Sequence, residues 1–571
     1  YSKQKISSFV NFLRHMAGAT ARQIFLPCSI TVVTFHTAIT YKMIRTGMGV
    51  NGNLYINQNG IQYRIERKYM NQDKTPLLEA VQKLISTKPA YFRVPGHRLE
   101  NGIDSRWTDF VGTKIFAYDV TETPFTDDLH CPEGAILEAQ QLLANLYGAD
   151  KSFFLVNGTT CGNEAMILSA ALEGQEIMIA RNAHKSALMG LILSGAKPVS
   201  IMPEVLPQWG IQGGISPEII ERTFQKHPNC KALFLVSPSY YGIASDLQAI
   251  AEICHAYGAL LLVDEAHGGH CYFHKLLPTG ALKCGADICV QSMHKVAGAL
   301  TQSSVMHIKS HGIADDCFAS VPKNLQLLQS TSPNYLLMIS LDCARHQLAV
   351  YGSRMMEKAL FLADYARTEI RKIFGFRCMG NEVTGVSEIK AIDLTRLVIS
   401  AKEIGLTGYA LEQILFEQYA VNMELADDEN VLAIVTYANT KEDMERLVEA
   451  CRDISSSIAK DKKAYEKNLE GIYQKEAVSY PLLPEQVFTP RQAYFAQTSK
   501  IPWKEAIGKV SAQTIAPYPP GIPILYSGER ITKEIWNFLE YFRQENRHIH
   551  GTEDGKLDYI LVIQEAYIYE Q

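Results

Sequence analysis

Short apolar runs alternate with longer amphipathic segments through the middle of the chain. Five of these runs end in small or polar residues and lead into helical patterns: SFFLVNGTTCGN, EIMIARNAHKS, KALFLVSPSYYG, ALLLVDEAHGG and DICVQSMHK. The segments between them leave room for crossover helices, such as one predicted over residues 247–257. This order predicts an α/β domain whose mostly parallel sheet is covered by helices on both faces. Ligands of such sheets bind beyond the carboxyl ends of the strands, where all five runs carry polar or reactive residues.

The 571 residues are too many for one hydrophobic core, and the pattern changes several times along the chain. Behind Thr75-Pro76, apolar residues at helical spacing predict a helix, and the segment 460–475 reads as a charged helical connector. The predicted divisions are an N-terminal arm over 70–130, a large domain over 131–345, a small α/β domain over 346–458, and the connector with a C-terminal domain over 459–571.

Residues 1–69 differ in composition from the rest of the chain. They hold nine Lys or Arg and one acid, a net charge of +8, whereas the remaining residues carry −13. Two interpretations compete: a basic, acid-poor targeting segment, or upstream sequence translated in frame that is not part of the working protein. The second is favoured because hydrophobic, Asn/Gly and Thr patches are mixed here without one amphipathic period. N-terminal sequencing of the expressed protein distinguishes them.

Composition excludes several classes of protein. Hydrophobic residues make up 47 % and charged residues 20 %, and the net charge is −5, without a Lys/Arg stripe of the kind that binds nucleic acid. The twelve cysteines are scattered singly, which favours reduced thiols and a cytoplasmic location. The chain lacks an uninterrupted apolar stretch of about 20 residues, so a membrane is not expected as a partner. Nucleic acid is not expected either, because of the charge pattern.

A glycine-bearing turn follows the first apolar run. It spans Asn157 to Asn163 and leads into the apolar helix AMILSAAL. Free N–H groups and hydroxyls at the start of a helix bind phosphate. Taken alone, the turn could equally be a plain strand-to-helix connection with Thr160 as its cap.

Two later strand ends carry an acid and a lysine. Asp264 closes a run of four apolar residues, and a buried acid at that position needs a cationic partner. The protonated ring nitrogen of pyridoxal phosphate is such a partner, and its aldehyde binds a lysine amine, a role open to Lys295. Ser292 and His294 could hold the phosphate. Singly, Asp264 could be a cap or a salt-bridge partner and Lys295 a surface lysine, but phosphate turn, acid and lysine occur in the order that this cofactor requires.

Histidines near these positions have two interpretations. His184 could stack on the pyridine ring close to the substrate Cα, although a lone loop histidine is more often only hydrogen-bonded. His267, His270 and His274 lack a carboxylate or Cys pair at metal-binding separations. We therefore predict no metal site and interpret His267 as a neighbour of the cofactor.

Eight motifs, taken together, resemble the Orn/Lys/Arg decarboxylase family of polyamine synthesis and acid resistance. In chain order they are VPGHR, DVTETPFTDDLHCPEG, FFLVNGTTCGN, RNAHKS, VDEAHG, SMHK, STSPNYLL and APYPPGIPIL. The match runs from about Met70 to the C-terminus and most resembles the compact bacterial branch typified by biosynthetic arginine decarboxylase. It implies the fold-type I, aspartate aminotransferase-like fold and pyridoxal-phosphate-dependent decarboxylation of a basic amino acid to an amine and CO₂, feeding polyamine synthesis.

The same resemblance implies a role for each matched residue. Lys295 would bind the cofactor, Asp264 its ring nitrogen, and His184 would stack on the ring. Thr160, the backbone at Cys161, Ser292 and His294 would hold the phosphate. Thr331, in the STSP stretch, would come from the neighbouring subunit of a homodimer that shares its active sites. Two departures concern Cys161, where relatives usually have Ser or another small residue, and Tyr526-Ser527 before the Gly-Glu pair, where relatives often have Pro.

An aminotransferase of the same fold is the alternative. Such enzymes generally hold the substrate carboxylate with an Arg on a late strand of the small domain, whereas the stretch 422–436 has no Arg and is acidic. The substrate also stays open among arginine, lysine and ornithine, with a weak preference for arginine from the resemblance. The candidate acids for its cationic tail are Glu122, Asp127, Asp128 and Glu424.

Overall fold

The computed structural model describes residues 51–57, 60–66, 70–312, 315–460, 480–518, 521–545 and 547–564. The chain divides into two compact units, Tyr1–Met70 and Asn71–Gln571. In the first, strands β1 (Asn51–Asn57) and β2 (Gly60–Glu66) pair as an antiparallel hairpin. The rest of the basic segment 1–69 falls outside the described residues. The hypothesis that this segment does not belong to the working protein therefore stays a prediction.

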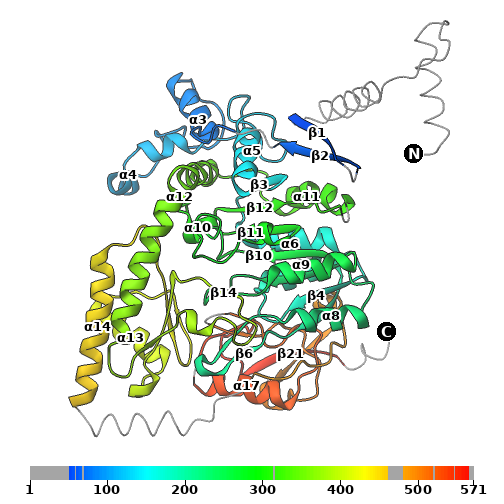
Figure 1. The fold of residues 1–571 in the computed structure, drawn as a ribbon, viewed down its shortest axis with the longest axis vertical. Coiled ribbons are helices and arrows are strands. Elements are labelled where there is room, and N and C mark those ends of the chain that lie inside the picture. The colour runs from blue at the N-terminus through cyan, green and yellow to red at the C-terminus, as the bar shows by residue number, and fades with distance from the viewer. Residues whose placement is uncertain are drawn as a thin grey trace, which may run out of the picture. The chain divides into compact units, whose positions relative to one another are not determined.

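A seven-stranded sheet forms the centre of the second unit, in the order β3-β12-β11-β10-β8-β4-β5 (Figure 1). All five strands predicted from the apolar runs are present: β3 (Lys151–Leu155), β4 (Glu176–Ala180), β8 (Ala232–Val236), β10 (Leu260–Asp264) and β11 (Ile288–Gln291). The sheet also contains β5 (Lys197–Ile201) and β12 (Ser304–Ile308), which were not predicted. Because β12 pairs antiparallel with both β3 and β11, β3 keeps the direction of the parallel strands. The carboxyl ends of the five predicted strands therefore meet at one edge, which confirms the predicted α/β class.

Successive residues of each strand enter different hydrophobic cores, as the alternation of side chains across a strand requires. In β10, Leu261 and Val263 belong to one core, whereas Leu260 and Leu262 belong to the other. The first core is covered by α3 (Pro76–Ser86), α5 (Ala135–Tyr147), α8 (Pro217–Lys226), α9 (Leu247–Ala256) and the start of α12. The second is covered by α6 (Gly158–Ala170), α7 (Lys185–Ser194) and α11 (Asp315–Leu328). Helices α3 and α9 occur where the sequence predicts them.

Helix α12 (Tyr335–Ile370) links the large sheet to a smaller antiparallel one. Its buried residues join the first core up to Leu360 and a separate core from Leu362 onward, so the predicted division at 345 falls inside one helix. The small sheet has the order β13-β15-β17-β16. Its elements are β13 (Arg377–Cys378), β15 (Arg396–Ser400), α13 (Gly408–Tyr419), β16 (Leu425–Ala426), β17 (Val431–Ile434) and α14 (Lys441–Lys460).

The C-terminal part has its own core, built around Trp503, Ile535 and Leu539. Its elements are α16 (Pro490–Phe495), β18 (Thr498–Pro502), β19 (Ala516–Pro517), α17 (Lys533–Gln544), β20 (Ile549–His550) and β21 (Tyr559–Ile563). The predicted connector over 460–475 falls outside the described residues except for Lys460. Over the described residues, every helix is too short or too polar to cross a membrane.

The remaining elements are short. They are α4 (Ser105–Val111), α10 (Met293–Val296), β6 (Val205–Leu206), β7 (Ile211–Gln212), β9 (Ile243–Ala244) and β14 (Ala391–Ile392), with the 3-10 turns η1 (Lys114–Tyr118), η2 (Pro207–Trp209), η3 (Ala281–Cys284), η4 (Asn381–Val383), η5 (Lys402–Ile404) and η6 (Trp503–Glu505). Strands β9 and β14 pair with each other as a separate two-stranded antiparallel sheet, which joins a segment that follows β8 to one that precedes β15.

Candidate active site

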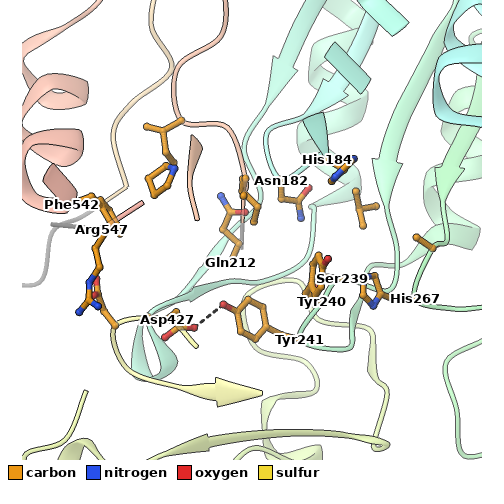
Figure 2. A pocket seen from close by; sticks show the side chains of 18 of the residues that line it. Asn182, His184, Gln212, Ser239, Tyr240, Tyr241, His267, Asp427, Phe542 and Arg547 are labelled. Carbon is orange, nitrogen blue, oxygen red and sulfur yellow. Dashed lines mark hydrogen bonds between the residues drawn. The ribbon is translucent and has the colours of Figure 1, made fainter. Parts of the chain in front are cut away.

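A cavity of about 470 Å³ lies beyond the carboxyl ends of the parallel strands. Its walls come from three parts of the chain: the large sheet supplies Asn182 and His184, the small domain Asp427, and the C-terminal part Phe542 and Arg547 (Figure 2). Seven of the predicted site residues line it: Thr160, His184, Asp264, His267, Ser292, His294 and Lys295. Residues from four separate strand ends thus meet at one place, as expected for a sheet of this kind.

Lys295 lies in the short helix α10, just beyond β11. Its Nζ is 2.8 Å from Nε2 of His267 and 4.9 Å from the centre of the Tyr240 ring. Burial lowers the pKa of Lys295 to about 8, although the negative charge of Asp264 acts in the opposite direction. A large fraction of this amine is therefore uncharged in mildly alkaline solution, which is the form that attacks an aldehyde.

Asp264 is the last residue of β10 and is 3 % exposed. Its Oδ1 accepts a hydrogen bond from the backbone N–H of Ala266 at 3.0 Å, and its Oδ2 accepts one from Nδ2 of Asn163 at 2.7 Å. The same amide group donates to Oγ of Ser186 at 2.8 Å. Asn163, which was not among the predicted residues, therefore holds the carboxylate in place from helix α6.

His184 caps the N-terminus of α7. Its Nδ1 accepts a hydrogen bond from the backbone N–H of Ser186 at 3.2 Å and lies 2.9 Å from the Ser186 hydroxyl. Burial lowers the pKa of His184, with Asp264 opposing. Because Nδ1 accepts the capping bond, the proton of the neutral ring is assigned to Nε2.

The glycine-bearing turn becomes the start of α6, with Gly158 at a φ of +73°. Within this turn, the side chain of Thr159 reaches the neighbouring segments of the sheet. Its hydroxyl is hydrogen-bonded to Ser292 and lies 3.0 Å from Oγ of Ser304. Thr160, the residue proposed from the sequence, also lines the cavity. These hydroxyls and the unpaired N–H groups of the first helical turn form a cradle suited to a phosphate.

Two predicted residues do not line the cavity. The side chain of Cys161 points into the second core, its Sγ lies 3.2 Å from the carbonyl oxygen of Gly158, and burial raises its pKa to about 12. Thr331 is exposed, although the N–H of the preceding Ser330 donates to Asn157 beside the phosphate turn. The predicted roles of the Cys161 backbone and of Thr331 from a neighbouring subunit stay predictions.

His267 is fully enclosed, and its ring centre lies 4.1 Å from that of Tyr240. Burial, and next to it the positive charge of Lys295, hold the pKa of His267 well below its usual value, so the ring is neutral. The nearby His270 has a different partner, since its Nε2 pairs with Asp393 at 2.9 Å. His267 is thus a direct neighbour of the lysine, closer than the sequence alone suggested.

Sequence reasoning sought an arginine clamp only in the stretch 422–436. The structure places a buried arginine, Arg396, on β15 of the small domain. Its Nη2 donates to the carbonyl oxygen of His267 at 3.1 Å, and its Nε lies 3.3 Å from Asp393. Arg396 is not among the residues that line the cavity, and its bond to the His267 carbonyl supports the wall behind that histidine.

The predicted acids for a substrate tail lie elsewhere. Asp127 caps α5, accepting the N–H groups of Gly134 and Ile136, and neither Glu122 nor Asp128 lines the cavity. Glu424 is exposed and is not among the lining residues. Its negative charge, like that of Asp264, partly opposes the lowering of the Lys295 pKa by burial. Apart from Asp264, the acids that line the cavity are Asp427, Asp428, Glu429 and Glu545.

The donor set of this cavity fits pyridoxal phosphate. Lys295 supplies an amine for the aldehyde, Asp264 a buried carboxylate for the ring nitrogen, and the start of α6 with Ser292 a phosphate cradle. A further sign is Nδ1 of the enclosed His267, a buried ring nitrogen with no hydrogen-bond partner among the described residues.

Comparison with protein families identifies two matching models. Residues 75–443 match the model described as Orn/Lys/Arg decarboxylase, major domain, and residues 471–555 match Orn/Lys/Arg decarboxylase, C-terminal domain. An arginine decarboxylase of Bacillus subtilis (strain 168) is 38 % identical over 496 residues, which cover 87 % of this chain and 99 % of the relative. An arginine decarboxylase of Halalkalibacterium halodurans is 38 % identical over 499 residues, covering 86 % of this chain and 98 % of the relative.

Solved structures support the fold. The lysine decarboxylase LdcF of Francisella novicida superposes with a TM-score of 0.74 at 22 % identity, over 86 % of this chain and 81 % of that chain. The constitutive lysine decarboxylase of E. coli superposes with a TM-score of 0.72 at 21 % identity, over 86 % and 82 % of the two chains. At these identities the likeness concerns the fold alone.

Proposed function

Since this chain belongs to the Orn/Lys/Arg decarboxylase family, we propose that it uses pyridoxal phosphate to convert arginine to agmatine and CO₂. Family membership makes it a basic amino-acid decarboxylase and sets aside the aminotransferase alternative. The observation that carries the proposal is the convergence of Lys295, Asp264 and the phosphate cradle on one cavity. Arginine is favoured because the relatives at 38 % identity are arginine decarboxylases.

When bound, pyridoxal phosphate supplies an electron sink for the bonding pair that remains on Cα as CO₂ leaves. The carboxylate of Asp264 keeps the ring nitrogen protonated, and Asn163 holds that carboxylate in orientation. Thr159, Thr160 and Ser292 hold the phosphate together with the N-terminus of α6. His294, which also lines the cavity, assists at the phosphate end.

Proton transfer to Cα falls to a group with a proton at the right place. We assign it to the protonated amine of Lys295 or the protonated ring of His184, because both residues line the cavity and a pKa lowered by burial makes each protonated group a stronger acid. General acid catalysis of this kind contributes about 10²–10⁴-fold to a rate. The neutral His267 accepts a hydrogen bond from Nζ of Lys295 and orients it.

The cationic tail of the substrate points, in this proposal, toward the acidic end of the cavity. Burial raises the pKa of Asp427 to about 6, and its Oδ2 accepts a hydrogen bond from the Tyr241 hydroxyl at 2.7 Å. Asp428 and Glu545 add negative charge to the same lining, whereas Glu429 is paired with Lys402, which also lines the cavity. Arg547 stacks on the Tyr409 ring at 3.6 Å, which occupies one face of that ring.

We also propose a homodimer that works in the cytoplasm. The arm exposes large apolar side chains, with Phe92 87 %, Trp107 57 % and Phe110 89 % exposed, and exposed apolar surface of this size favours a protein partner. A second copy placed there is expected to bring its Thr331 toward the phosphate cradle. Sedimentation of a Phe92→Asp/Phe110→Asp variant tests this: a monomer with lost activity is expected, and an unchanged dimer contradicts it.

The cytoplasmic location rests on the scattered cysteines, and those described form no disulfide.

Product analysis with purified holoenzyme tests the function. Arginine, lysine and ornithine are supplied separately, and CO₂, amine and keto acid are measured. Agmatine is expected; cadaverine or putrescine as main product overturns the substrate, and a keto acid without CO₂ overturns the reaction. Lys295→Ala should lose turnover together with the visible absorbance of covalently bound cofactor, and retained turnover would end the assignment of Lys295.

A further inference from the structure

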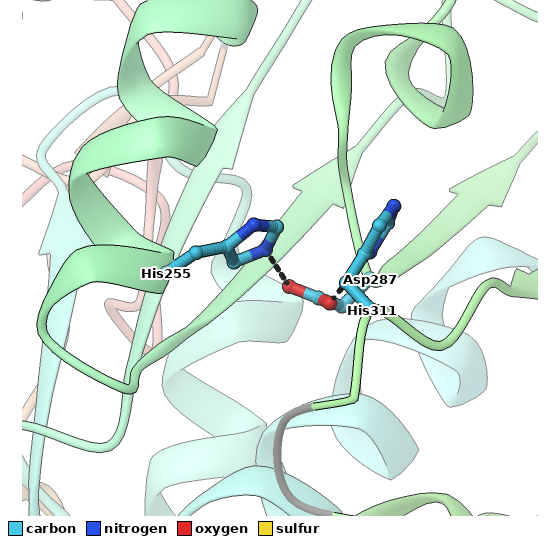
Figure 3. Close-up of side chains that lie close together, drawn as sticks. All are labelled: His255, Asp287 and His311. Atoms are coloured by element: carbon cyan, nitrogen blue, oxygen red, sulfur yellow. Dashed lines mark hydrogen bonds and ion pairs between the residues drawn. The ribbon is translucent and has the colours of Figure 1, made fainter. Parts of the chain in front are cut away.

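A second cluster of ionisable side chains lies at the opposite end of the large sheet. It comprises His255 in the last turn of α9, Asp287 immediately before β11, and His311 shortly after β12 (Figure 3). The strand β11 separates Asp287 from Ser292, a span on the order of 16 Å at the usual rise per residue. This cluster is therefore separate from the proposed active site.

The two imidazoles face the same carboxylate from opposite sides. Nε2 of His255 is 3.0 Å from Oδ2 of Asp287, and Nδ1 of His311 is 3.0 Å from its Oδ1. The ligand atoms that the three residues offer all lie within 4.8 Å of one another. The ligand atoms of three side chains from three separate segments are thus nearly as close to one another as the ligands of a bound metal ion.

The charge of Asp287 requires compensation. This side chain is 0 % exposed, and buried carboxylates are normally paired with a cation or bound to a metal. Within the described part of the chain, its ion pairs are with the two histidines, and Oδ2 also accepts the backbone N–H of Leu261 at 2.8 Å. A bound cation can supply this compensation in place of a proton on either imidazole, with the same ring nitrogens facing it.

We propose that His255, Asp287 and His311 bind a first-row divalent cation, with Zn²⁺ as the best match. Two imidazole nitrogens and a carboxylate oxygen are ligands that Zn²⁺ prefers, whereas Mg²⁺ and Ca²⁺ favour sites built from oxygen. Each imidazole nitrogen is 3.0 Å from a different oxygen of Asp287, which is shorter than the edge of about 3.3 Å in a tetrahedron with bonds of about 2.0–2.1 Å, so the rings must shift slightly as the cation binds.

Binding needs both rings neutral, with protons on Nδ1 of His255 and Nε2 of His311, so that the facing nitrogens offer lone pairs. The histidine side chains are 23 % and 26 % exposed, so water can complete the coordination and the cation has a path of entry. The bound ion joins the end of α9 to the segment after β12 and serves stability, not the decarboxylation. The prediction of no metal site considered only His267, His270 and His274. His255 and His311 lie 32 and 24 positions from Asp287 and form no local motif with it.

Cobalt and zinc titrations of the chelator-treated full chain test the site. Wild type is expected to give the visible absorbance of nitrogen- and oxygen-bound Co²⁺ at one equivalent, and added Zn²⁺ is expected to displace it and raise the melting temperature. His255→Ala and His311→Ala should each weaken binding by about tenfold or more. His227→Ala is the matched control, because His227 forms a lone histidine pair with Glu176 at 3.0 Å.

Circular dichroism establishes that each variant is folded before its titration. Should a variant fail to fold, the wild-type Co²⁺ spectrum and the zinc-dependent melting shift still decide the matter. The proposal is overturned if wild type shows neither signal, or if folded His255→Ala and His311→Ala bind as tightly as the His227→Ala control. None of these measurements depends on catalytic turnover.

Discussion

Lys295 is half-buried in the wall of the cavity, next to the neutral ring of His267 and above Tyr240. Burial disfavours its charged form, and Asp264 only partly offsets this effect. The unfolded chain binds a proton at this lysine up to a pKa near 10.5, whereas the folded chain releases it at about 8. Between these values the folded state therefore gains stability as the pH rises, and below about 8 the buried charge is unfavourable.

The reaction of Lys295 with pyridoxal phosphate should follow this lowered pKa. In apoenzyme, the rate of cofactor attachment is expected to rise about tenfold per pH unit below 8 and to level off above it, because only the uncharged amine reacts. Stopped-flow absorbance at several pH values measures the rate. A rate that still rises steeply beyond pH 9 would mean that the amine keeps an ordinary lysine pKa.

Asp264 is expected to serve the chemistry and not the retention of the cofactor. Asp264→Asn removes the charge but keeps the shape, so the phosphate cradle still binds while turnover falls by about 100-fold or more. Asp364→Asn, an exposed acid on α12, serves as the control. Steady-state kinetics and cofactor retention after dialysis are compared; an unaltered kcat in Asp264→Asn would contradict the role.

At the scale of elements, the position of α6 against the sheet decides the cradle. A Cβ atom on Gly162 would lie 2.7 Å from Leu155 and 2.8 Å from Val290, on two strands beneath the helix. The second glycine of the turn is thus required for close packing, and this packing brings Thr159 to Ser292 and Asn163 to Asp264.

Gly162→Ala is expected to push α6 away from the sheet. Overpacking of this kind costs about 1–3 kcal/mol, and it should also weaken cofactor binding by displacing Thr159 and Asn163. Gly96→Ala is the control, since nothing lies within 4 Å of its added Cβ. Urea unfolding and cofactor titration measure both effects. Equal stability of the two variants would show that α6 does not depend on this contact.

At the scale of the whole molecule, a buried ion pair fastens the C-terminal part to the large sheet. Arg181, next to β4, contacts Oε1 of Glu529 at 2.5 Å and the carbonyl oxygen of Ile524 at 2.7 Å, and its guanidinium lies 3.6 Å from the centre of the Tyr526 ring. Both charged side chains are almost fully buried. Because the C-terminal part forms one wall of the cavity, this pair contributes to the shape of the site.

Breaking the pair from one side should release this wall. Arg181→Met leaves the Glu529 carboxylate buried without a cationic partner, which costs about 3–5 kcal/mol. Arg181→Met with Glu529→Leu removes both charges and should be far milder. Melting temperature and proteolysis of the C-terminal part distinguish the two variants. Equal losses in both would mean that shape, and not the uncompensated charge, determines the docking.

Much of the site could be predicted from the sequence because its chemistry follows strand ends. An apolar run that ends in Asp264 and another that leads to Lys295 place both residues at the same edge of a parallel sheet, whatever the packing in between. By contrast, the sequence could not show that Asn163 and Thr159 contact the site more directly than Thr160, because their partners Asp264 and Ser292 belong to other strand ends. The directions of side chains on the first turn of α6 depend on how the helix packs.

The sequence by itself determined the α/β class, five of the seven strands of the large sheet, the family, and the lysine and acid expected to serve the cofactor, since local hydrophobic period and short motifs specify these. Only the tertiary structure decided which residues close the cavity. Segments hundreds of residues apart bring Asp427, Arg547 and the Arg181–Glu529 pair to the strand ends. These contacts arise from the packing of separate cores, to which no local pattern in the chain corresponds.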